Sequence, residues 1–147
     1  MVTQHVNTAE LFEVVRQVIE QGFNRGNYAA LDALVPEQSL EHQDGLHANR
    51  EEFKRDIQFL RRGFPDFHLT IEEMVLDGDR VWVRSTARGT NLGPFMGPPT
   101  GKRIEVTVFD ECRVQNGQVV EHWGVPDRFT VLAQIGRLPS PKPEGTN

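Results

Sequence analysis

A run of alternating residues in the last third of the chain constrains the fold more than any other feature. From Lys102 to Val114, apolar side chains alternate with charged or hydroxyl ones, a period typical of a strand with one buried face. Shorter alternations span residues 67–75 and 81–89, and a fourth run, 119–125, follows a turn. The second half of the chain therefore predicts strands joined by hairpins into an antiparallel sheet.

The first half of the chain predicts helices instead. A first helix, capped by Asn7 or Thr8, is expected to run to about Phe23, because apolar residues recur there at helical spacing. A short helix over 28–34 and a third helix capped by Asn49 follow. Residues 39–43 are a candidate short strand, and residues 128–136 a closing helix with Asp127 as its cap. Helices followed by hairpins predict an α+β fold, in which N-terminal helices wrap a curved antiparallel sheet around an internal pocket.

Length and composition fit one domain with one core. The 147 residues carry a net charge of −5 with both signs interspersed, which argues against a nucleic-acid-binding surface. We expect a single domain over residues 1–137 and a disordered, proline-rich tail over 138–147. No apolar run reaches membrane-spanning length and no secretory signal is evident, so the expected location is cytoplasmic.

Metal and cofactor sites are not expected. Cys112 is the one cysteine in the sequence, which excludes an intrachain disulfide and a cysteine-based zinc site. The five histidines lack the spacing of a metal-binding motif. The predicted chemistry therefore uses side chains alone.

Asp110 interrupts the buried face of the 102–114 strand. A carboxylate at a buried position costs several kcal/mol unless a partner or solvent stabilises it, and carboxylates in apolar clefts tend to be active-site groups. A structural carboxylate, hydrogen-bonded to His122 or to the backbone, is the alternative. Apolar surroundings disfavour its charge, whereas a neighbouring imidazolium favours it.

The partner of Asp110 depends on the turn at residues 115–117. A two-residue Asn116–Gly117 turn would place Trp123 opposite Asp110, whereas a three-residue loop with a bulge places His122 there. The second register also matches Val120 with Cys112, so we favour it and predict an Asp110–His122 pair on an apolar sheet face.

Three short segments carry a resemblance to a known family. Gly22–Asn27, Gly97–Arg103 and Asn116–Trp123, with Gln134–Gly136 closing the match, resemble the SnoaL-like polyketide cyclases in order and spacing. The resemblance implies the cone-shaped α+β fold shared with nuclear transport factor two and ketosteroid isomerase. Family fold does not fix the reaction.

The resemblance also implies which residues surround the substrate. In the family, the even-numbered side of the last two strands faces the pocket, which implies that Val108 and Gly124 line it beside the catalytic candidates Asp110 and His122. The cyclases use an aspartate at the position of Gly124, and commonly a histidine at that of Asp110. The pocket carboxylate has therefore moved to the neighbouring strand.

Further substrate-binding candidates lie outside these two strands. Phe95 and Met96 sit in a long Gly- and Pro-rich loop of the kind that forms a pocket rim or lid. His42 lies near the expected pocket mouth, although surface exposure is an equal alternative; for Glu41 next to it we favour a surface role. Tyr28 offers a hydroxyl, but core packing is the alternative.

These residues predict a small-molecule enzyme of secondary metabolism that needs no cofactor. Asp110 would act as the base on a hydrophobic, polyketide-like skeleton, with His122 as its partner or as the acid. Epoxide opening and a non-catalytic hydrophobic-ligand-binding module are the alternatives. Trp82 and Trp123 fall on the outer side of the sheet, which favours a homodimer through that face.

Overall fold

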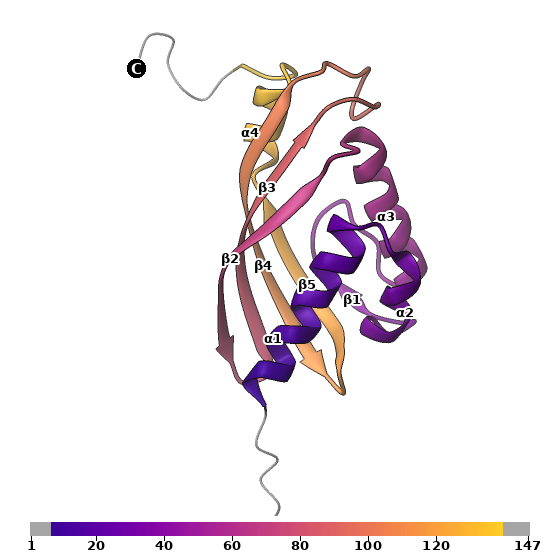
Figure 1. Cartoon of the computed structure of the whole chain (residues 1–147), viewed down its shortest axis with the longest axis vertical. Coiled ribbons are helices and arrows are strands. Elements are labelled where there is room, and N and C mark those ends of the chain that lie inside the picture. The colour runs from indigo at the N-terminus through magenta and orange to yellow at the C-terminus, as the bar shows by residue number, and fades with distance from the viewer. Residues whose placement is uncertain (1–6, 140–147) are drawn as a thin grey trace, which may run out of the picture.

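The computed structural model describes residues 7–139, and these form a curved five-stranded sheet with helices packed on its concave side (Figure 1). The strands are β1 (Leu40–Glu41), β2 (His68–Asp77), β3 (Arg80–Thr90), β4 (Arg103–Gln115) and β5 (Gln118–Pro126), in the order β1-β5-β4-β3-β2. All neighbours pair antiparallel except β1, which runs parallel to β5. The predicted α+β class is confirmed, with this one parallel pair as a difference from an all-antiparallel sheet.

The helices begin where the sequence predicts caps. In α1 (Thr8–Gln17) the Asn7 side chain accepts a hydrogen bond from the backbone of Ala9 at 3.1 Å. The helix continues as a π-helical segment, η1 (Val18–Asn24). A 3₁₀ turn, η2 (Tyr28–Ala30), leads into α2 (Leu31–Leu34). Asn49 caps α3 (Arg50–Gly63), and Asp127 caps α4 (Arg128–Gln134). Most of the predicted tail, residues 140–147, lies outside the described residues.

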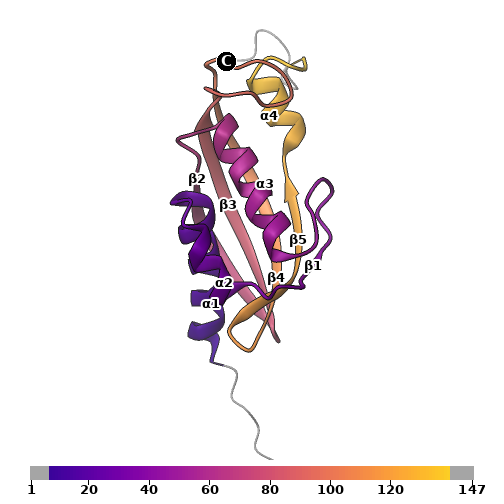
Figure 2. The same ribbon diagram turned by 90° about the vertical axis from the view of Figure 1, so that its right-hand side faces the viewer.

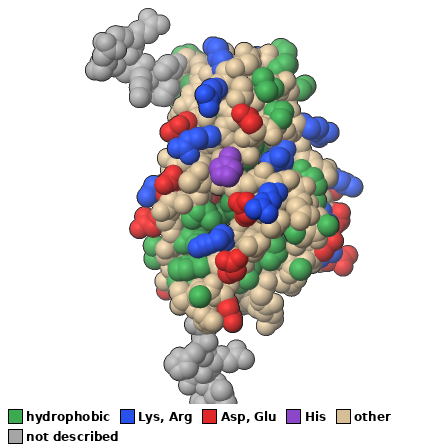
Figure 3. Space-filling view, in the orientation of Figure 1, with side chains coloured by type: hydrophobic (Ala, Val, Ile, Leu, Met, Phe, Trp, Pro, Cys, Tyr) green, Lys and Arg blue, Asp and Glu red, His purple; other side chains and the backbone are tan. Residues whose placement is uncertain are grey.

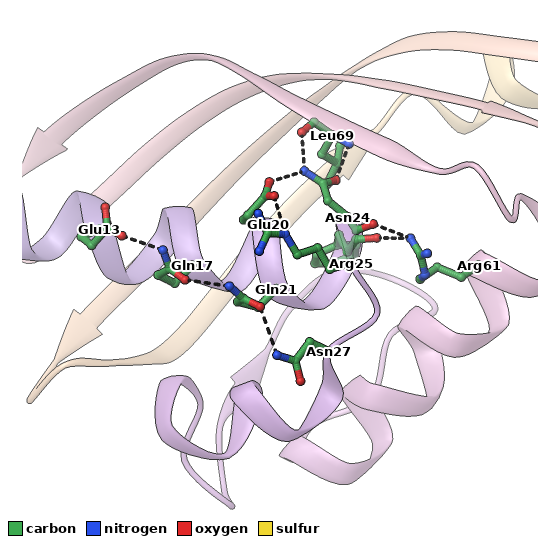
Figure 4. A network of polar contacts seen from close by, with 10 residues as sticks. Glu13, Gln17, Glu20, Gln21, Asn24, Arg25, Asn27, Arg61 and Leu69 are labelled. Atoms are coloured by element: carbon green, nitrogen blue, oxygen red, sulfur yellow. Dashed lines mark hydrogen bonds and ion pairs between the residues drawn. The ribbon is translucent and has the colours of Figure 1, made fainter.

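Hydrogen bonds between Asn24 and the backbone of Leu69 join the end of η1 to strand β2. Asn24 donates to the carbonyl of Leu69 at 3.0 Å and accepts from its N–H at 2.7 Å, as an extra strand residue would (Figure 4). Arg61 of α3 donates to the carbonyls of Phe23 and Asn24 at 2.6 and 3.0 Å. These bonds satisfy the backbone at the end of η1 and fix α3 across the open side of the sheet, as Figure 2 shows.

The register of the last hairpin differs from our prediction. Asn116 and Gly117 both have positive φ (51° and 74°), so the turn is the two-residue type that Asn-Gly favours, not a three-residue loop. A register shift after Arg113 then adds one residue to β5, and Asp110 pairs with Gly124 while Cys112 pairs with His122. Between the turn and the bulge, Val119 points into the core. Beyond the bulge, the even-numbered residues of β5 face inward instead. The matching of apolar pairs in the sequence did not reveal this change of side.

Candidate active site

A cavity of about 460 Å³ lies between the concave face of the sheet and the helices. Its walls are mainly aliphatic and aromatic side chains from α1, η1, α3 and the inward faces of β3 and β4. An apolar lining of this kind has a low dielectric constant, which strengthens electrostatic interactions inside it. Six phenylalanines contribute to the walls: Phe23, Phe53, Phe59, Phe64, Phe67 and Phe95.

His122 forms the polar centre of this cavity, held between two carboxylates. Its Nε2 lies 2.9 Å from Oδ1 of Asp110, and its Nδ1 lies 2.8 and 2.9 Å from the two carboxylate oxygens of Glu41. The three side chains are largely buried, with exposed fractions of 19% for His122, 15% for Asp110 and 7% for Glu41. An imidazole that bonds a carboxylate at each nitrogen donates from both, so it is the imidazolium form that fits.

The surroundings of His122 favour that charged form. Burial opposes the charge and by itself lowers the pKa of the imidazole, but the hydrogen bonds and the negative charges of Asp110 and Glu41 outweigh it and raise the pKa of His122 to about 9. At neutral pH the cluster is therefore an imidazolium between two carboxylates. A group that stays protonated through pH 5–8 serves as a fixed positive partner rather than as a proton shuttle.

Glu41 is the site residue that our sequence analysis assigned wrongly. We favoured a surface role, yet its side chain is buried, bonds His122 and accepts the backbone N–H of Gln43 at 2.8 Å. Strand β1 is only two residues long, so no alternation within it reveals which side faces inward. The parallel pairing of Glu41 with His122 in β5 determines that side.

His42 consequently points the other way, and its predicted place in the pocket is wrong. Its ring stacks on Trp123 with centroids 4.2 Å apart, and its Nε2 lies 3.0 Å from Oε1 of Glu121. Arg80 lies over the same indole, 5.1 Å from its centroid. Trp123 is thus covered on the outer side of the sheet, as its odd position predicts, and takes no part in the cavity.

Asp110 and His122 meet, although not as a directly opposed pair. Gly124 lies opposite Asp110, and His122 is the diagonal neighbour, a separation that an imidazole ring spans. Gly124 leaves room for this contact. A Cβ atom there would lie 2.0 Å from Oε1 of Gln43, 2.8 Å from Cε1 of His122 and 2.9 Å from Oδ1 of Asp110.

The remaining substrate-binding candidates divide into two groups. Val108, Phe95 and Met96 line the cavity, and the Phe95 ring packs against Phe64 with centroids 5.1 Å apart. Tyr28 lies outside the lining: it packs against the core, and its hydroxyl is near Gly26. The core-packing alternative is therefore correct for Tyr28.

Comparison with known proteins agrees with this geometry. The family model described as SnoaL-like polyketide cyclase matches residues 13–135. The chain belongs to this family. Among solved structures, IdmH of Streptomyces antibioticus, provisionally assigned as a polyketide cyclase, is 35% identical, with 86% of this chain and 98% of that one covered and a TM-score of 0.77. No protein of curated function matches by sequence.

Other solved structures share the fold at lower identity. TsrD of Streptomyces laurentii superposes with a TM-score of 0.82 over 90% of this chain and 99% of that one, at 23% identity. AclR of Streptomyces galilaeus, provisionally assigned as a hydroxylase, has a TM-score of 0.80 at 25% identity and covers 94% of this chain and 87% of its own. The predicted family and cone fold are therefore confirmed, while the relatives differ in assigned reaction.

The part of this SnoaL-like chain that the structure describes contains neither a metal-binding cluster nor a membrane-spanning helix. Residues 7–139 contain no cluster of His, Cys, Asp and Glu side chains that could hold a metal ion. Asp110 and Glu41 do not converge on one point, because they bond opposite ring nitrogens of His122. Within the same residues, no helix is both long and apolar enough for a membrane span. Figure 3 shows acidic and basic side chains intermixed on the face in view.

Proposed function

We propose that the protein is a cyclase or isomerase that acts on a hydrophobic, polyketide-like carbon skeleton, with Asp110 as the general base. One observation carries the proposal: Oδ1 of Asp110 is bonded to His122, while none of the described residues gives Oδ2 a hydrogen bond. The carboxylate lines an apolar cavity, so that oxygen is available to a substrate. A positioned base of this kind contributes roughly 10²–10⁴-fold to a rate.

The proposed reaction begins at a carbon next to a carbonyl group. Oδ2 of Asp110 takes a proton from that carbon, and the electron pair of the C–H bond becomes an enolate. The enolate carbon attacks a second carbonyl of the same molecule, forming a C–C bond and an alkoxide. The alkoxide then takes the proton back from Asp110, so the base is regenerated and the product is an isomer of the substrate.

His122 stabilises the ionised base in this scheme. Its positive charge lies between the carboxylates of Asp110 and Glu41 and offsets the repulsion between them. The cavity itself holds the chain of the substrate in a folded conformer, and holding two reacting carbons together supplies a large share of such a barrier.

A model ketone tests the proposal without the natural substrate. In D₂O, the wild-type protein should accelerate exchange of the α-protons of 2-tetralone, an apolar bicyclic ketone, above the buffer rate in proton NMR. Hydrolysis of styrene oxide should stay at the buffer rate. Epoxide hydrolysis without ketone exchange would favour epoxide opening, and saturable binding of 2-tetralone with neither reaction would favour a binding module.

Gly124 provides a second test of the site. Gly124→Ala should lower the exchange rate roughly 10²-fold, because displacement of a reacting group by about 1 Å can cost that much. The added methyl would force Gln43, His122 and Asp110 apart. Circular dichroism and thermal unfolding should show an intact fold. A wild-type exchange rate in this variant would show that the close packing around Gly124 has no role.

We also propose a homodimer through the outer face of the sheet. Apolar side chains are paired there in the ladder: Val75 with Trp82, and Phe109 with Val125. They are between 47% and 70% exposed, which is unusual for residues of this size and typical of an interface. Light scattering at micromolar concentration should give the mass of a dimer for the wild type and of a monomer for Trp82→Glu. A wild-type monomer would refute the proposal.

A further inference from the structure

Removal of a proton next to a carbonyl leaves negative charge on an oxygen, and neither Asp110 nor His122 stabilises it in the proposed reaction. In an apolar cavity that charge is costly unless a hydrogen-bond donor meets it. His122 is not that donor, because Asp110 and Glu41 occupy both of its ring nitrogens. A second polar group must therefore face the substrate beside Asp110.

Gln43 is a neutral donor at the required place. It lies in the loop after β1 and lines the cavity. Its side-chain oxygen occupies the space that a Cβ of Gly124 would need, 2.0 Å from that position, and Oδ1 of Asp110 lies 2.9 Å from the same position. The two atoms are therefore no more than about 5 Å apart. A carbonyl oxygen and its α-carbon can span two such groups, each within a hydrogen-bond distance of about 3 Å.

The side chain of Gln43 is free to serve a ligand. None of the described residues hydrogen-bonds its carboxamide, whereas its backbone N–H is held by Oε1 of Glu41 at 2.8 Å. Glu41 thus positions Gln43 and His122 together. Rotation about the last side-chain bond exchanges the amide oxygen and nitrogen, so Nε2 can occupy the place beside the Gly124 Cα.

We infer that the Gln43 carboxamide donates a hydrogen bond to the carbonyl oxygen of the substrate and stabilises the enolate that Asp110 generates. This inference rests on the proposed function and specifies its substrate class: an enolisable ketone whose carbonyl oxygen lies beside the Gln43 carboxamide and whose α-carbon lies beside Asp110. The proton still moves from carbon to Asp110 and back, and Gln43 keeps its protons throughout.

The test uses Gln43→Met, which keeps an unbranched side chain of similar length but has no donor. Its kcat for 2-tetralone exchange should fall roughly 10²-fold or more, as for other oxyanion donors, while KM changes little. Gln58→Met, the same replacement at an exposed position of α3 with no side-chain hydrogen bond, should match the wild type. Thermal unfolding checks that both variants fold.

A spectroscopic measurement separates this inference from the proposed function. The infrared carbonyl stretch of bound 2-tetralone, labelled with ¹³C at the carbonyl, should lie lower in the wild-type protein than in Gln43→Met, because a hydrogen bond weakens the C=O bond. The same stretch in the wild type and in Gln43→Met overturns the inference, even if the wild type catalyses exchange. A lower wild-type stretch without exchange supports the Gln43 contact and counts against Asp110 as the base.

Discussion

Asp110→Asn should lower the rate of 2-tetralone exchange by roughly 10²–10⁴-fold, the usual share of a general base. Asparagine has almost the same shape, and its side-chain oxygen can still accept a hydrogen bond from Nε2 of His122. What it lacks is the second carboxylate oxygen, Oδ2, which we propose as the base. The variant should therefore fold normally and still bind the ketone, with the loss confined to kcat.

Asp77→Asn is the matched control, because this substitution removes the same charge at a position outside the cavity. Asp77 lies at the exposed end of β2. It should exchange 2-tetralone at the wild-type rate. Unchanged turnover in Asp110→Asn would show that the carboxylate is not the base. The cavity would then act through its shape or through another side chain.

The stability of the protein should fall as the pH rises from about 5.5 to 8.5. The folded-state pKa of His122 is raised to about 9, above the value of about 6.5 for an unfolded chain. The stabilisation of the folded protein by protonated His122 is therefore fully present below pH 6.5, where the folded and the unfolded chain both bind the proton. This stabilisation is lost as the pH rises towards 9. The free energy of unfolding should decrease by about 2 to 3 kcal/mol over this interval.

Urea unfolding at several pH values measures this effect. The interval ends at pH 8.5 because burial also raises the pKa of the Cys112 thiol, which adds a loss of the same sign at higher pH. Glu41→Gln removes one of the two carboxylates that hold the imidazolium, so this variant should show a clearly smaller pH dependence. If the free energy of unfolding depends on pH equally in the wild type and in Glu41→Gln, the hydrogen bond from Glu41 does not stabilise the imidazolium of His122.

Much of this architecture follows from the sequence because it depends on local patterns. Alternation predicted the long strands, and side-chain caps at Asn7, Asn49 and Asp127 predicted where helices begin. The same alternation placed Asp110 on the buried face of its strand. This position indicated a candidate active site, because a carboxylate on an apolar face requires a partner.

The features that the sequence did not reveal depend on non-local pairing. The shorter, two-residue turn and one bulge residue in β5 together moved the partner of Asp110 from His122 to Gly124, and no pattern within the hairpin distinguishes that register from its alternatives. Glu41 and Gln43 join the site through the pairing of a two-residue strand with β5, about 80 residues further along the chain.

Asp110 can act as described only if His122 carries a proton on both ring nitrogens at neutral pH. Nitrogen-15 NMR of the histidine side chains measures this directly. At pH 7.5, both ring nitrogens of His122 should show the chemical shifts of an imidazolium, with a titration midpoint near 9. A neutral ring at pH 7.5, with a midpoint near the ordinary value of about 6.5, would contradict the clamped imidazolium and the base that it holds.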